Sequence, residues 1–144
     1  MASGGSDVPM EDAAEIRHAV MLLARRLRTA GPPESLSGNK LAVLGHLYRR
    51  GPSAAGEVAA AEGQRPQSLT RVFAELEEDG LITRSRDEAD RRQAVLALTQ
   101  AGLDALRRDT ARRDAWLAEA LGGLSGTERE LLRLAARLME RLGD

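Results

Sequence analysis

The chain has 144 residues, of which 42% are hydrophobic and 30% are charged, and its formal net charge at pH 7 is −1. These values fit one folded domain and exclude a polycation, so any affinity for nucleic acid has to come from local patches of positive charge. Cysteine is absent and only two histidines are present, which excludes disulfides and thiolate metal sites and disfavours a structural zinc site.

The chain begins with the small, polar and acidic sequence MASGGSDVPMEDAAE. This sequence has neither the basic start nor the apolar stretch of a signal peptide. No apolar run in the chain approaches the roughly 20 residues that span a membrane. We therefore expect a cytoplasmic protein without membrane contact, and a flexible tail over residues 1–10.

The first predicted helix covers residues 11–29 and ends at the glycine and prolines of residues 31–33. Its apolar side chains recur at the spacing of one helical face: Ile16, Val20, Leu23 and Leu27. Ser37 is an expected N-cap for a second helix, which residues 51–52 end. The apolar positions of this second helix are Leu41, Leu44, Leu47 and Tyr48.

A short third helix is expected after Ser53, which is in position to cap it, and Gly63 ends it. Pro66 suits the first turn of a fourth helix, and Gly80 stops that helix. The apolar residues of the fourth helix fall at i, i+3, i+4 and i+7, which predicts a buried stripe. This stripe consists of Leu69, Val72, Phe73 and Leu76.

Residues 81–86 and 93–99 are predicted to form two strands of a hairpin, joined by residues 87–92. Thr99 is the expected N-cap of a long helix that runs toward the glycine pair at residues 122–123. Ser125 is the expected N-cap of the last helix. The apolar stripe of this helix contains Leu131, Leu134, Ala135, Leu138 and Leu142.

Four helices, a hairpin and two further helices predict a mainly α protein with a small β-hairpin wing, a winged helix-turn-helix. In one compact domain, residues 11–36 form an N-terminal dimerisation helix and loop, residues 37–99 the winged lobe, and residues 100–144 C-terminal dimerisation helices. The terminal helices carry more apolar surface than the short lobe can cover. We therefore expect dimerisation through both ends of the chain.

The fourth helix is the candidate for reading DNA, because the second helix of a helix-turn-helix enters the major groove with its N-terminal residues nearest the bases. With the apolar stripe facing inward, Gln64, Gln67, Ser68 and Arg71 face outward. Glutamine can bond adenine and arginine can bond guanine. The residues predicted to lie in the major groove are Arg65, Gln67, Ser68 and Arg71. The alternative is that they only solvate an exposed face.

Four acidic residues gather at the other end of the fourth helix: Glu75, Glu77, Glu78 and Asp79. Carboxylates inside the groove would be repelled by phosphate. We therefore expect these four side chains to point away from the DNA backbone.

Residues 53–102 resemble the core of the MarR family of bacterial transcriptional regulators. The matching residues are Glu57, Val58, Arg71, Val72, Leu76, Gly80, Leu81, Ile82, Asp90, Arg91, Arg92, Leu98, Thr99 and Gly102. The D-x-R sequence of the wing, followed by L-x-L-T and a glycine, is more specific than a helix-turn-helix pattern alone. Helix order and chain length match over about residues 11–142.

The resemblance implies a homodimer that binds a pseudopalindromic operator in double-stranded DNA, with each wing in a flanking minor groove. In this family the arginine of the D-x-R sequence enters the minor groove and the aspartate orients it, which assigns these roles to Arg92 and Asp90. A narrow A·T-rich minor groove is strongly negative and attracts arginine. We expect Arg86 and Arg91 to contact phosphate and Arg84 to hold the wing together.

The resemblance also implies a small anionic or phenolic effector, bound in a cleft between the dimer helices and the winged lobe. Arg17, His18 and His46 are the candidate effector residues. The alternative is that each histidine is a surface or partly buried residue without a ligand. The missing cysteines exclude the thiol-based peroxide sensors of the family, and no cofactor is implied.

The sequence contains no nucleophile elbow, P-loop, glycine-rich dinucleotide turn or H-E-x-x-H motif, so we expect no enzyme activity. The function predicted from the sequence is sequence-specific transcriptional regulation, by a repressor that a ligand releases from DNA. A winged helix used only for protein contacts is the alternative. Such a module would be expected to lack the polar outward face and the wing arginines.

Overall fold

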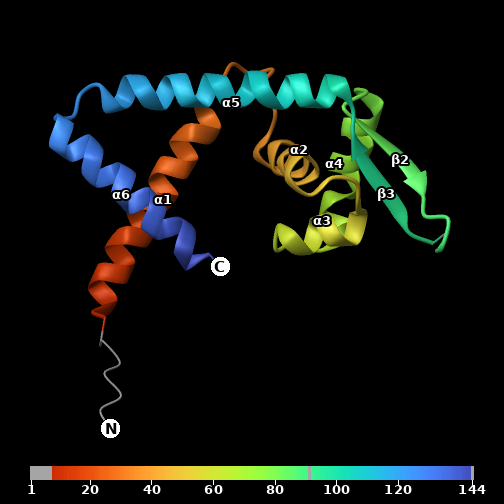
Figure 1. Cartoon of the computed structure of the whole chain (residues 1–144), viewed down its shortest axis with the longest axis horizontal. Coiled ribbons are helices and arrows are strands. Elements are labelled where there is room, and N and C mark those ends of the chain that lie inside the picture. The colour runs from red at the N-terminus through yellow and green to blue at the C-terminus, as the bar shows by residue number, and fades with distance from the viewer. Residues whose placement is uncertain (1–7, 91, 144) are drawn as a thin grey trace, which may run out of the picture.

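The computed structural model describes residues 8–90 and 92–143. Figure 1 shows the long helix α5 along one edge of the molecule, with α1 and α6 at one end of it and the winged lobe at the other. The elements in chain order are α1 (Met10–Thr29), α2 (Gly38–Arg50), β1 (Ser53–Ala54), α3 (Ala55–Ala61), α4 (Pro66–Glu78), β2 (Ile82–Arg86), β3 (Ala94–Leu98), α5 (Gln100–Leu121) and α6 (Gly126–Leu142). This is the predicted winged helix-turn-helix architecture. The predicted tail over residues 1–10 lies mostly outside the described residues, and Met10 already belongs to α1.

Three of the predicted N-caps are confirmed. The Ser37 hydroxyl accepts a hydrogen bond from the Lys40 amide at 3.3 Å, and the Thr99 hydroxyl accepts one from the Gly102 amide at 3.0 Å. Ser125 forms a full capping box, because the Glu128 carboxylate also accepts from the Ser125 amide at 2.7 Å. The hydrogen bond from the Ser125 backbone amide, and next the one with the Ser125 side chain, hold the pKa of the Glu128 carboxyl below its usual range.

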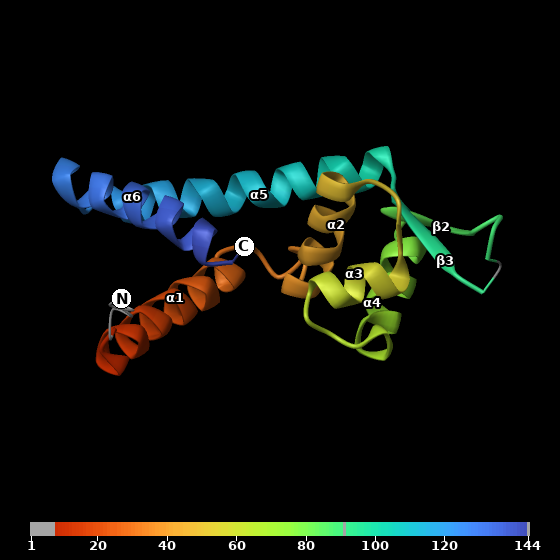
Figure 2. The same cartoon turned by 60° about the horizontal axis from the view of Figure 1, so that its bottom comes forward.

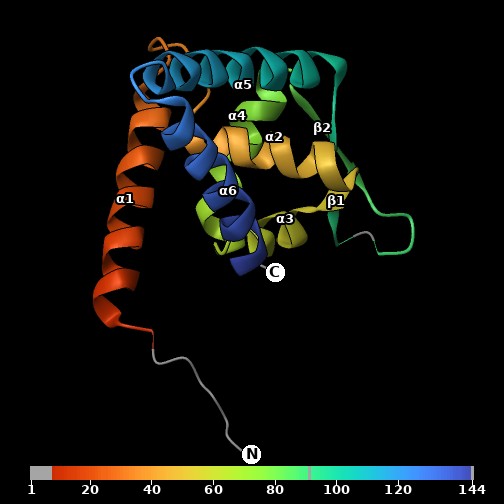
Figure 3. The same ribbon diagram turned by 60° about the vertical axis from the view of Figure 1, so that its left-hand side comes forward.

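The predicted N-cap at Ser53 is wrong. Ser53 belongs to β1, which pairs with β3 in the register Ser53↔Leu96, and Ala54 occupies the N-cap position of α3 without a side-chain hydrogen bond. Pairing with β3 draws Ser53 into the sheet, where it is buried. Its hydroxyl donates to the Gly51 carbonyl at 2.9 Å. Figure 3 shows β1 beside the hairpin, between α2 and α3.

The hairpin therefore becomes a three-stranded antiparallel sheet in the order β1-β3-β2. The register of β2 and β3 runs from Ile82↔Leu98 to Arg86↔Ala94, so both predicted strands are confirmed to within one residue at each end. The loop between them projects beyond the lobe as the wing, as Figure 2 shows.

The core lies in the winged lobe, where α2, α3, α4 and the sheet meet. Leu69, Phe73 and Leu76 of the predicted stripe are buried, and Val72 packs against the core half-buried. Tyr48 is predicted to lie on the apolar face of α2, but its side chain is not buried with that face, because the residue is 59% exposed. It lies beside α5, in a groove described below. The remaining buried hydrophobic residues are Val43, Leu44, Leu47, Val58, Ala59, Ile82 and Leu96.

A close backbone approach joins α5 to the lobe. The Thr99 amide donates to the Leu81 carbonyl at 3.1 Å, and its hydroxyl donates to the Gly80 carbonyl at 2.7 Å. A Cβ on Gly102 would overlap the Leu81 carbonyl oxygen and would lie 2.8 Å from a methyl of Leu98. Glycine is therefore required at position 102 by packing, which gives a physical reason for the glycine that follows the L-x-L-T sequence.

A buried carboxylate fixes the loop between α1 and α2 to the middle of α5. Asp109 is 3% exposed. It accepts from the Leu36 amide at 2.9 Å and from Arg113 Nε at 3.1 Å, while Arg113 Nη2 donates to the Leu36 carbonyl at 3.2 Å. Both charges are thereby paired and hydrogen-bonded, as burial requires.

The terminal helices have the opposite character. None of the described residues in α1 or α6 is buried, although both helices carry large apolar side chains. Those exposed on α6 are Leu131, Leu132, Leu134, Leu138, Met139 and Leu142, and those on α1 include Ile16, Val20, Met21 and Leu23. Among the described helices, none is long and apolar enough to cross a membrane.

Candidate nucleic-acid interface

The residues predicted to lie in the major groove are found on the outer side of α4 and at its N-cap. Pro66 starts the helix directly after Arg65, and the buried stripe holds its inner side against the core. Arg65, Gln67, Ser68 and Arg71 are all exposed. The structure therefore brings these four residues together on the N-terminal half of α4. Their contact with bases stays a prediction.

Gln64 differs from its neighbours. It is half-buried, and its Nε2 donates to Asn39 Oδ1 at 3.1 Å. This hydrogen bond ties the turn before α4 to the first turn of α2. Gln64 therefore supports the geometry of the helix-turn-helix.

Arg71 and its neighbour Glu75 form an ion pair on α4. Arg71 Nε lies 2.8 Å from Glu75 Oε1, and Lys40 of α2 lies 3.0 Å from Glu75 Oε2. Hydrogen bonds from Lys40, and next from Arg71, hold the pKa of Glu75 below its usual range. Glu75 is one of the four acidic residues expected to point away from DNA, but it lies next to Arg71, a candidate base-reading residue. Its negative charge is balanced there by Lys40 and Arg71.

The turn of the wing is ordered by two aspartates. Asp90 Oδ1 accepts from the Arg92 backbone amide at 3.0 Å, and Asp87 Oδ1 accepts from the Ala89 amide at 3.0 Å. The Gln93 amide donates to the Asp90 carbonyl at 3.0 Å. Asp90 therefore sets the backbone at Arg92, whose side chain is exposed. Arg91 lies outside the described residues.

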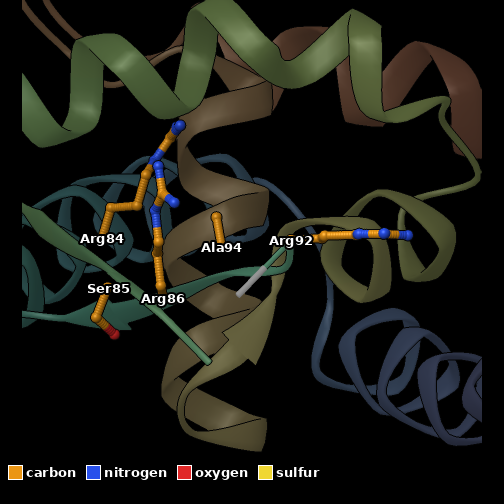
Figure 4. A pocket seen from close by; sticks show the side chains of 5 residues that line it. All are labelled: Arg84, Ser85, Arg86, Arg92 and Ala94. Atoms are coloured by element: carbon orange, nitrogen blue, oxygen red, sulfur yellow. The ribbon is translucent and has the colours of Figure 1, made fainter. Parts of the chain in front are cut away.

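A shallow groove of about 540 Å³ runs along the wing, lined by Arg84, Ser85, Arg86, Arg92 and Ala94. Figure 4 shows the side chains of Arg84 and Arg86 close together and that of Arg92 pointing away from them. Arg84 Nε also lies 3.2 Å from Glu77 Oε2 at the end of α4. Arg84 therefore links β2 to the end of α4, and its role in holding the wing together stays a prediction.

Known proteins share both the sequence and the fold of this chain. Residues 35–93 match the family model described as MarR family. An uncharacterized HTH-type transcriptional regulator of Mycobacterium leprae is 36% identical over 95 residues, which are 66% of this chain and 66% of the relative. The crystal structure of a transcriptional regulator from Pseudomonas aeruginosa PA01 is 34% identical, covers 96% of this chain and 98% of its own, and superposes with a TM-score of 0.79. The chain belongs to the MarR family.

This family consists of transcriptional regulators rather than enzymes, in agreement with the resemblance found in the sequence. Bordetella bronchiseptica BpsR has the same fold, with a TM-score of 0.67 and 22% identity over 88% of this chain and 98% of its own. The DNA binding of BpsR is regulated by 6-hydroxynicotinic acid.

The residues predicted to bind an effector lie on two different helices of this MarR-family chain. Arg17 and His18 are exposed on α1. His46 is buried, and its Nε2 lies 3.3 Å from the Ser53 hydroxyl, which ties α2 to β1. Arg17 and His18 are thus neighbours on the surface of α1 while His46 is enclosed in the lobe, and effector binding by these three residues stays a prediction.

A groove of about 450 Å³ lies between α2 and α5. Tyr48, Arg49 and Arg107 give it aromatic, polar and positive groups. The other lining residues are Gly45, Leu103, Leu106, Thr110, Ala111 and Asp114. No local sequence pattern predicts this groove, because it depends on how α2 packs against α5, about 50 residues later in the chain. The one local signal was the position of Tyr48 at the edge of the apolar stripe of α2.

Proposed function

We propose that this MarR-family chain is a homodimeric transcriptional repressor that binds a pseudopalindromic operator in double-stranded DNA. The observation that carries the proposal is the exposed face of α4, where Gln67, Ser68 and Arg71 are presented by a helix whose inner side is fixed in the core. A helix fits the major groove, where glutamine recognises adenine and arginine recognises guanine. Occupation of the operator then blocks the polymerase.

The wing extends the contact beyond the major groove. We propose that Arg92, held at its backbone by Asp90, enters the flanking minor groove, where the negative potential of a narrow A·T-rich segment attracts it. Arg86 and Arg91 contact phosphates and supply affinity that does not depend on sequence.

The exposed apolar faces of α1 and α6 support the homodimer. Two copies related by a two-fold axis would cover these faces and present two α4 helices to one DNA. Paired helix-turn-helix units read half-sites about 34–36 Å apart, one turn of the double helix. A pseudopalindromic operator follows from that symmetry.

The test is to let the full-length protein select duplexes from a randomised library and to footprint the enriched sequence. The expected result is an inverted repeat with half-sites about one helical turn apart, with protection of the flanking minor grooves. A chain that enriches no sequence would contradict the proposal. That result would favour the winged helix as a protein-interaction module.

We further propose that a small anionic or phenolic effector releases the repressor and that it binds between α2 and α5. Arg49 and Arg107 would pair with an acidic group and Tyr48 would stack on an aromatic ring. The regulation of BpsR by 6-hydroxynicotinic acid supports an acid of this kind. Titration with 6-hydroxynicotinic acid and benzoic-acid analogues, followed by thermal shift and DNA release, tests this. If Arg49→Ala and Arg107→Ala respond like the wild type, the groove is not the site.

A further inference from the structure

Glu75 is the place where two cations from different helices meet. Its Oε1 accepts a hydrogen bond from Arg71 Nε at 2.8 Å, one turn earlier on α4. Its Oε2 lies 3.0 Å from the ammonium group of Lys40, in the first turn of α2. Each carboxylate oxygen is therefore held by one cation, and the lowered pKa of Glu75 agrees with an ionised carboxylate.

This arrangement differs from an isolated surface ion pair, which contributes little. The side chain of Lys40 is only 21% exposed and that of Glu75 is 37% exposed, whereas that of Arg71 is 90% exposed. The inner two members therefore form a support that spans α2 and α4, and the outermost member extends into solvent from that support.

The atom through which Arg71 is held matters for recognition. Glu75 engages Nε, and the two Nη groups have no hydrogen-bond acceptor among the described residues. These Nη groups form the end-on fork that can donate to O6 and N7 of guanine. The pair thus orients the guanidinium and leaves its recognition edge available.

We infer that Glu75 is a positioning residue that sets the sequence preference of Arg71, with Lys40 as its support. The inference rests on the proposed function, in which α4 reads bases. An arginine that is already oriented loses less conformational freedom when it binds. The negative charge of the carboxylate also repels DNA phosphates of any sequence. We therefore expect Glu75 to lower non-specific affinity while it raises the preference for one sequence.

The test uses the full-length protein and two duplexes at one fixed salt concentration: the sequence that the wild type enriches from a randomised library, and a shuffled duplex of the same composition. Glu75→Gln should bind the shuffled duplex at least as tightly as the wild type does. Its specificity ratio between the two duplexes should fall about twofold to tenfold, because an uncharged amide with one acceptor oxygen cannot hold Arg71 and Lys40 together as the carboxylate does. An unchanged ratio would overturn the inference.

Glu78→Gln is the matched control, because it removes the same charge from an exposed position on α4. This control should leave the ratio unchanged. An equal fall in both variants would show that only net charge matters and would overturn the inference. Glu75→Asp keeps the charge, but its side chain is too short to bridge both cations, so its specificity ratio should fall as well. A specificity ratio equal to that of the wild type in Glu75→Asp would count against the positioning role.

The Arg71→Ala background separates this inference from the proposed function. With Arg71 absent, Glu75→Gln should no longer change the ratio, and a persistent fall would overturn the inference. If the wild type enriches no sequence, or Arg71→Ala alone keeps the full ratio, base reading by Arg71 itself has failed. A loss in Arg71→Ala without a loss in Glu75→Gln refutes only the positioning role.

Discussion

The carboxylate of Asp90 accepts a hydrogen bond from the backbone amide of Arg92 at 3.0 Å. The aspartate therefore orders the turn before Arg92 and leaves the guanidinium exposed. An asparagine side chain can accept the same bond, whereas alanine cannot.

Arg92→Ala should weaken binding to the selected operator, because the guanidinium itself is lost. Asp90→Ala should weaken it to a smaller extent, and Asp90→Asn should stay near the wild type. Fluorescence anisotropy at fixed salt measures all three affinities. Glu88→Ala is the control in the same turn, and an effect of Glu88→Ala equal to that of Asp90→Ala would argue against a specific role for the Asp90 hydrogen bond.

Arg71→Ala and Arg86→Ala should have different effects on DNA binding: the first on sequence preference, the second on affinity for any sequence. Loss of a base-reading Arg71 should cost about 1–3 kcal/mol on the operator and relax the preference at one base pair. Loss of a phosphate-binding Arg86 should weaken binding to all sequences and reduce the slope of log affinity against log salt by about 1. Salt titrations with the selected and shuffled duplexes distinguish the two results, and equal behaviour of both variants would contradict the assignment.

Gly102→Ala should destabilise the fold, because its Cβ would overlap the Leu81 carbonyl oxygen at the junction of α5 with the lobe. We expect a loss of about 1–3 kcal/mol in the free energy of unfolding. The control is Gly126→Ala in the first turn of α6, where the nearest side-chain atom is 3.9 Å away; there the change should stabilise by about 0.4–1 kcal/mol. Urea unfolding measures both, and a neutral Gly102→Ala would refute the close approach.

Asp109→Ala should lower the free energy of unfolding by about 3–5 kcal/mol, because it leaves the guanidinium of Arg113 largely buried without its carboxylate. Replacing both residues together, Asp109→Leu with Arg113→Met, should recover most of the loss. Asp114→Ala, at an exposed position on the same helix, is the control. If the double variant is no more stable than Asp109→Ala, an unpaired charge is not the cause.

Leu138→Glu should convert the proposed dimer into a monomer, because it places a charge in the apolar face of α6. Operator affinity should fall with it, since one subunit contacts only one half-site. Sedimentation velocity and anisotropy measure the two effects. Ala136→Glu lies about 200° away around the same helix and should remain dimeric; a monomeric wild type would overturn the proposed assembly.

The sequence predicted best what is determined locally. Ser125 and Thr99 cap their helices because the acceptor and donor lie within three residues of each other, and the stripe of α4 follows from its own periodicity. Ser53 was misassigned because its partner, Leu96, lies 43 residues away. The link from Leu36 to Asp109 was missed for the same reason, since a single aspartate on a long helix gives no sign of the loop that it binds.

The helix α5 is continuous for 22 residues, which gives a length of about 33 Å. Thr99 and Gly102 fix one end of it to the winged lobe, while its other end leads into α6. A tilt of about 10° at one end of such a rod moves the other by about 6 Å, nearly two base-pair steps at about 3.4 Å each. In the proposed dimer, the stiffness of α5 would therefore limit how far the spacing between the two α4 helices can vary, and with it the spacing of the half-sites that one dimer accepts.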